Sequence, residues 1–94
     1  MNLQDRHTDS AISTYQFFKG EIGLSVALQI KAGERLKEHT SNTEAVLLCI
    51  SGLAQFDNQM GLVQELRSGD FVVIEALVAH RVIALETSQF ILFK

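Results

Sequence analysis

The sequence predicts an all-β barrel or sandwich, and three observations carry that prediction. Apolar residues alternate with a period of two or form short continuous runs. Turn residues separate these runs at intervals of about 8–12 residues, the spacing of small all-β domains. No apolar stripe at helical spacing persists beyond about two turns, and Val, Ile and Phe are frequent. Strands of about five residues joined by short turns are typical of sandwiches and barrels.

The first clear strand is Leu24–Ile30, where every even position is apolar, the pattern of a half-buried strand. Further strands are predicted at Ala45–Ile50, Leu53–Phe56, Leu62–Leu66, Phe71–Ile74, His80–Leu85 and Gln89–Phe93. The predicted turns are Gly20–Gly23, Ala32–Glu34, Ser51–Gly52, Asp57–Gly61, Ser68–Asp70 and Glu86–Ser88. Residues 11–94 are expected to form one domain. We expect the polar residues 1–10 to be disordered or to add an edge strand to a partner subunit.

The composition of the chain argues against several classes of function. The 94 residues suit a single domain, and the net charge of −3 argues against binding to nucleic acid or to an anionic membrane surface. No apolar run approaches the ~18 residues of a transmembrane helix. The polar start of the chain lacks the apolar segment of a signal peptide. The lone Cys49 has no partner for an internal disulfide, so we expect a reducing, cytoplasmic location.

Several predicted strands are apolar at nearly every position, so that neither face is suited to water. These are Ala45–Ile50, Val82–Leu85 and Phe90–Phe93. Such strands are covered on both faces, and no predicted helix is available to cover the second one. We therefore expect a homodimer joined through a sheet face. The alternative is a deeper sandwich core with apolar edges.

Two segments carry a resemblance to a known family. Gly33–Gly52 contains His39 between its terminal glycines, and resembles the first motif of the cupins. Gly69–His80, a Gly-Asp turn followed by an apolar strand, a loop and a histidine, resembles the second motif. The chain is thus similar to small, single-domain, RmlC-like cupins of the cupin 2 type. The resemblance implies a double-stranded β-helix, or jelly-roll barrel, with a pocket near the two histidines.

The same resemblance implies an incomplete metal site. Metal-binding cupins supply two histidines spaced by one residue and a glutamate from the first motif, and a third histidine from the second. His39 and His80 match the first and last histidines, while Ser41 stands at the second histidine and Ala45 at the glutamate. Glu44 falls one residue early, on the opposite strand face. A divalent transition metal could therefore use only His39 and His80.

The candidate pocket comprises His39, Ser41, Cys49 and His80. Cys49 is either a soft third ligand or redox-active thiol, or a small buried hydrophobe; packing is the favoured interpretation. Arg81 is expected to reach the rim or to pair with an acidic residue. The pocket exists only if the barrel mouth is open, and it closes if the interior is filled by Leu28, Leu47, Phe71, Val73 and Val82.

Three functions remain open at this stage. The first is a dimeric module that binds or senses a small molecule without a full metal site. The second is a metal-dependent enzyme of the dioxygenase or isomerase type, using His39 and His80. The third is a structural domain that binds a partner through its apolar sheet faces. Fold alone does not choose among them.

Overall fold

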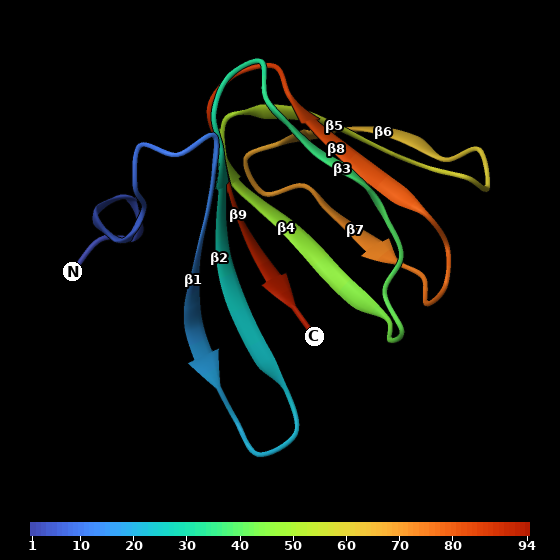
Figure 1. The fold of residues 1–94 in the computed structure, drawn as a ribbon, viewed down its shortest axis with the longest axis horizontal. Helices are drawn as coiled ribbons and strands as arrows, with labels where there is room; N and C mark the ends of the chain where they lie inside the picture. The colour runs from blue at the N-terminus through green and yellow to red at the C-terminus, as the bar shows by residue number, and fades with distance from the viewer.

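A computed structural model describes residues 1–94, and in it nine strands form two antiparallel sheets that pack face to face (Figure 1). The strands are β1 (Ile12–Lys19), β2 (Leu24–Ile30), β3 (Arg35–His39), β4 (Ala45–Ser51), β5 (Leu53–Asn58), β6 (Val63–Arg67), β7 (Phe71–Ile74), β8 (His80–Ala84) and β9 (Ser88–Phe93). The five-stranded sheet has the order β1-β2-β9-β4-β7, and the four-stranded sheet the order β3-β8-β5-β6. The predicted all-β class is confirmed.

Alternation along the strands decides which side chains enter the core. In β4, Ala45, Leu47 and Cys49 are buried and the residues between them are only partly buried. The core between the sheets holds 13 buried residues: Leu28, Ile30, Ala45, Leu47, Cys49, Ala54, Phe56, Leu66, Val72, Ile74, Val82, Ala84 and Phe90.

The structure corrects the predicted interior of the barrel at Phe71 and Val73. Both lie on the outer face of β7 and are 60% and 43% exposed, whereas Val72 and Ile74 are buried. The run Phe71–Ile74 is apolar at every position, so alternation alone cannot tell which pair points inward. Pairing with β4 decides it, because Val72 lies opposite the buried Leu47. The interior therefore holds smaller side chains at these positions than expected.

Two strands were not foreseen, and both lie at a sheet edge. β1 is largely exposed, and β3 carries polar side chains at four of its five positions. Most side chains of both strands are exposed, so neither segment shows a clear alternating pattern. In Figure 1 the β1–β2 hairpin extends beyond the other strands.

The first ten residues include a short 3-10 helix, η1 (Leu3–Arg6). The side chain of Asn2 caps η1 by accepting a hydrogen bond from the N–H of Gln4. His7 ties the segment to β1, since its Nδ1 lies 3.0 Å from the Oγ of Ser13. No helix of the structure has the length and apolar character needed to cross a bilayer.

Candidate functional site

The structure brings His39 and His80 together where the two ends of their strands meet. His39 is the last residue of β3 and His80 the first of β8, and the two are partners in the strand register. Their ring centroids are 4.2 Å apart with an interplanar angle of 61°. The two imidazole rings therefore pack against each other, edge to face.

A β-bulge in β3 turns His39 toward His80. Leu36 pairs with the buried Val82, and regular pairing from that point would place Glu38 opposite His80. The register shifts between Leu36 and His39, so one extra residue lies in β3, and the exposed His39 takes the place of Glu38 opposite His80. Bulges re-aim side chains in this way.

Backbone carbonyls orient both imidazoles. Nδ1 of His39 lies 3.0 Å from the carbonyl oxygen of Lys37, and Nδ1 of His80 lies 3.2 Å from that of Val78. Because a carbonyl oxygen only accepts, each Nδ1 carries the hydrogen and donates it. In a neutral ring, Nε2 is then left as a free acceptor. Because the two rings are in contact, both Nε2 atoms lie near the mouth between the sheets.

His80 is held in a desolvated position. It is only 3% exposed and stacks on Phe56, with centroids 5.8 Å apart. Burial lowers the pKa of His80, and the neighbouring His39 also lowers it, against the opposing effect of the hydrogen bond to Val78. The ring is therefore neutral at neutral pH, and its Nε2 accepts a hydrogen bond.

A pocket of about 170 Å³ opens beside the histidine pair. Its polar lining comes from His39, Thr40, Ser41, His80 and Lys94, and its apolar lining from Ala45, Ile74 and Leu92. These residues come from both sheets, so the pocket lies at the mouth between them. No carboxylate side chain lines it.

Ser41 helps to shape the rim of this pocket. Its Oγ donates to the carbonyl of Thr43 at 3.0 Å, and its own carbonyl accepts from the N–H of Leu77 at 2.8 Å. The second contact joins the β3–β4 loop to the β7–β8 loop. Since the hydroxyl hydrogen is already donated to a carbonyl, the geometry gives Ser41 a positioning role and offers no activated nucleophile.

Cys49 is the predicted pocket residue that the structure places elsewhere. It lies four residues along β4 from Ala45, which corresponds to about 13 Å in a strand, and it is buried in the core. Its Sγ donates to the carbonyl of Ser51 at 3.5 Å. Burial raises the pKa of the thiol, and so does the charge of Asp70. A protonated, enclosed thiol packs as a small hydrophobe.

The donors at the mouth do not make a full metal site. No three His, Cys, Asp or Glu side chains are grouped so that they could hold a metal ion. Ala45 occupies the inward position on β4, and Glu44 before it is exposed. Protein sites for zinc and related metals use three or more protein ligands, so the two imidazoles alone do not fit a resident metal.

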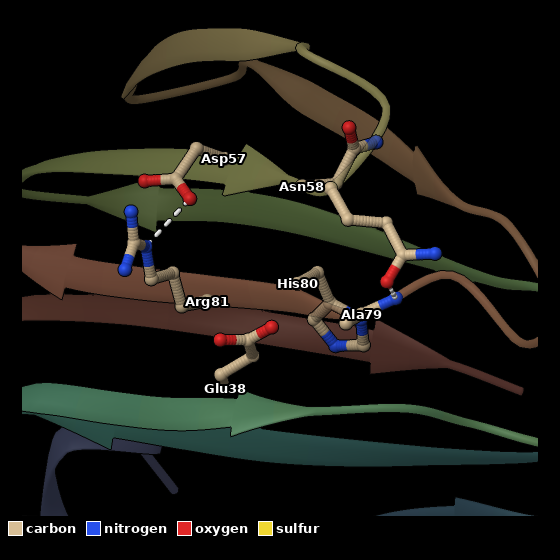
Figure 2. Close-up of a pocket in the computed structure, with 7 residues that line it drawn as sticks. Glu38, Asp57, Asn58, Ala79, His80 and Arg81 are labelled. Atoms are coloured by element: carbon tan, nitrogen blue, oxygen red, sulfur yellow. Dashed lines mark hydrogen bonds and ion pairs between the residues drawn. The ribbon is translucent and has the colours of Figure 1, made fainter.

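A second, polar pocket of about 120 Å³ lies on the other side of His80, over the outer face of the four-stranded sheet. Figure 2 shows Glu38, Asp57 and Arg81 on this face. Nε of Arg81 donates to Oδ1 of Asp57 at 2.6 Å, so of the two alternatives expected for Arg81 the structure shows the pairing with an acidic residue. Sequence reasoning missed this pocket because Asp57 and Arg81 meet only through β5–β8 pairing.

Comparison with solved structures identifies the fold. A cupin-2 domain protein from Shewanella frigidimarina superposes with a TM-score of 0.83 at 16% identity, covering 100% of this chain and 92% of that one. A conserved protein of unknown function from Streptococcus pyogenes gives 0.83 at 18% identity, covering 99% and 82%. KdgF from Halomonas sp. gives 0.82 at 18% identity, covering 90% and 80%.

The chain therefore has the fold of small RmlC-like cupins, the double-stranded β-helix that its two motifs suggested. No family model matches the sequence, and no curated relative matches it either. At these identities the comparisons define the fold alone, and the function has to be argued from the site.

Proposed function

We propose that this chain is a dimeric module that binds or senses a small molecule without a full metal site. The pocket at the mouth carries the proposal, because two imidazoles oriented through their Nδ1 atoms line it and no third metal donor accompanies them. A cytoplasmic location is part of the proposal, and the lone, buried thiol of Cys49 supports it.

The lining defines the kind of ligand that fits. His80, neutral at neutral pH, accepts a hydrogen bond from a hydroxyl or amide group, while Lys94 favours an acceptor or an anionic group. Ala45, Ile74 and Leu92 offer a short apolar wall. The volume of about 170 Å³ holds about six water-sized groups. The expected ligand is a small hydroxylated molecule, such as a short hydroxy acid.

A thermal-shift screen of metal-free protein tests this proposal. The panel consists of small hydroxy acids, sugars and alcohols. We expect some members to raise the Tm of wild type by a few degrees and to leave His39→Ala unchanged. His7→Ala is the matched control, because His7 lies in the N-terminal segment away from the mouth. Equal shifts in wild type and His39→Ala, or no shift with any compound, would remove the basis of the proposal.

The alternative function is a metal-dependent enzyme that uses His39 and His80. One observation favours it, because metal-binding histidines commonly donate their second nitrogen to a carbonyl, as both rings do here. Elemental analysis of natively purified, tag-free protein separates the two functions. About one transition metal per chain, lost in His39→Ala and kept in His7→Ala, would favour the enzyme. Folded, metal-free protein would favour the binding module.

A further inference from the structure

The polar pocket in Figure 2 adjoins a second cavity along β3, and charged side chains line both. The pocket has a volume of about 120 Å³ and the cavity one of about 300 Å³, and Glu38 and Arg81 line both of them. We call the two together the charged groove. Its charged side chains are those of Arg35, Lys37, Glu38, Asp57 and Arg81. The groove shares only His80 with the pocket at the mouth.

Arg81 occupies the centre of the charged groove and still has free hydrogen-bond donors. Because β8 lies between β5 and β3, Arg81 has Asp57 on one side and Glu38 on the other (Figure 2). Its one side-chain hydrogen bond runs from Nε to Oδ1 of Asp57. A guanidinium has two further nitrogens at its tip, which suit a carboxylate. The pairing with Asp57 therefore orients the guanidinium and leaves its two terminal nitrogens free for a ligand.

The remaining charges in the groove have no ionic partner. Asp57 and Arg81 pair with each other, and the other ion pairs of the structure lie outside the groove. Arg35 and Lys37 are thus unpaired cations, and Glu38 is an unpaired carboxylate. All three side chains are exposed. Unpaired charges of both signs in one groove complement a ligand that carries both signs itself.

Two amide side chains add neutral donors to the pocket. Oδ1 of Asn58 accepts from the N–H groups of Met60 and Leu62, at 2.9 and 3.1 Å. Oε1 of Gln59 accepts from the N–H of Ala79 at 3.3 Å. Since both amide oxygens are engaged with the backbone, the amide NH₂ groups are the parts left to donate to a ligand.

We propose that the charged groove binds a small zwitterion, and that its ligand class is the free α-amino acids. The ammonium group of the ligand binds the carboxylate of Glu38, and the ligand carboxylate binds the terminal nitrogens of Arg81, with Lys37 adding positive charge. The pocket of about 120 Å³ holds about four water-sized groups, enough for the ammonium group, the α-carbon and the carboxylate. The larger cavity along β3 receives the side chain.

The balance of charges favours a zwitterion over a simple ion. An anion alone would satisfy the basic side chains and leave Glu38 unpaired beside it. A cation alone would face Arg35, Lys37 and Arg81. This site lies outside the barrel, so it goes beyond the binding function proposed for the mouth and does not depend on it.

An NMR titration with three matched compounds tests the proposal. The compounds are L-alanine, propionate, which lacks the ammonium group, and ethylammonium, which lacks the carboxylate. We expect ¹H–¹⁵N spectra of wild type to show saturable shifts with L-alanine in residues 35–38, 57–59 and 81. Propionate and ethylammonium should bind about fivefold more weakly or less, because each loses one exposed ion pair.

Two variants in the groove and two controls assign the binding to its residues. Glu38→Gln and Arg81→Lys should each weaken L-alanine binding by about fivefold; the lysine keeps a positive charge beside Asp57 and removes the forked donors. Glu65→Gln is the matched control, since Glu65 is an exposed carboxylate on the same sheet that pairs with Arg67. His39→Ala is the second control. Both controls should bind L-alanine as wild type does.

Three results would overturn the proposal. They are the absence of saturable shifts with L-alanine, binding of propionate or ethylammonium as tight as that of L-alanine, and L-alanine binding that neither groove variant weakens. Shifts centred on residues 39–45 and 92–94 that vanish in His39→Ala would place the amino acid at the mouth. That last result removes the second site and leaves the binding function of the mouth standing.

Discussion

At the scale of single residues, His80 links the core to both pockets. It stacks on Phe56 inside the barrel and lines the pocket at the mouth as well as the polar pocket of Figure 2. Its Nδ1 is fixed by the carbonyl of Val78. Small changes at this residue should therefore affect stability and ligand binding together.

The titration of His80 makes stability depend on pH. Burial lowers its pKa in the folded state below the ordinary value of 6.5. Between those two values the unfolded chain binds more protons, so the free energy of unfolding falls as the pH drops below the ordinary value. Urea unfolding at a series of pH values measures this loss. We expect a shallower dependence in His80→Phe, which keeps an aromatic ring against Phe56.

His7 contributes to the same dependence in the same direction, because burial lowers its pKa as well. The His7→Ala variant separates the two contributions. A pH dependence in His80→Phe as steep as in wild type would contradict the assignment to His80.

Leu77 is the one non-glycine residue with a left-handed backbone, at φ 65°. It occupies the third position of a turn in which the N–H of Val78 bonds to the carbonyl of Glu75, a position that favours glycine. Its N–H also holds the β3–β4 loop through Ser41. Strain of this kind near a pocket is typical of functional loops.

Leu77→Gly should raise the free energy of unfolding by about 1 kcal/mol, because glycine adopts this conformation without strain. Leu77→Ala keeps the strain and should stay close to wild type, since the side chain is exposed. Urea denaturation compares the three proteins. A glycine variant no more stable than the alanine variant would contradict the strain assigned to the Leu77 backbone.

At the scale of elements, the β4–β5 turn depends on the absence of a side chain at Gly52. Its φ is 100°, and an added Cβ would meet the backbone of Thr87 and Ser88 at under 3 Å. Ser88 Oγ at this point accepts from the N–H of Leu53 at 3.0 Å. The β4–β5 turn therefore packs tightly against the start of β9.

Gly52→Ala should cost about 2 kcal/mol or more, because backbone has to move as well as adopt an unfavourable φ. Gly61→Ala is the control, since Gly61 has φ 92° and open space around it; only the backbone cost of about 1 kcal/mol applies there. Thermal or urea unfolding gives both values. Equal losses would contradict the close contact.

The sequence predicted seven of the nine strands, because their apolar patterns reflect burial. β1 and β3 were missed because most of their side chains are exposed and leave no clear apolar pattern. The two bulges could not be predicted from the sequence, for a different reason. Whether Glu38 or His39 faces His80, and where the β1–β2 register shifts between Gln16 and Phe18, depends on pairing with a neighbouring strand. The resemblance to cupins pointed to His39 and His80. Excluding Cys49 from the pocket required its distance along β4 from Ala45.

At the scale of the whole molecule, the small core is related to the exposed apolar side chains on the outer face of the five-stranded sheet, which include Phe18, Phe71 and Phe93. A chain of 94 residues buries only about 60–65% of its unfolded surface, and its core has 13 buried residues. In the proposed dimer, a second copy that covers this face would add apolar burial that the single chain cannot supply. The dimer should therefore be more stable than the isolated chain.

This coupling predicts a concentration-dependent Tm. Raising the wild-type concentration a hundredfold should raise the Tm by about 5 °C, because association stabilises the folded state. Phe93→Lys places a charge on this exposed apolar face, so it should stay monomeric and melt at a lower temperature that does not change with concentration. Differential scanning calorimetry measures both, and a wild-type Tm independent of concentration would contradict dimer-linked folding.

The central claim is that a small molecule binds without metal at the mouth between the two sheets. The most direct test records ¹H–¹⁵N NMR spectra of metal-free protein during titration with the strongest ligand of the thermal-shift screen. We predict that the shifts cluster in residues 39–45, 74–80 and 92–94, and that they vanish in His39→Ala. Shifts centred on η1 and β1, or on the charged face around Asp57 and Arg81, would place the binding site elsewhere and contradict the account.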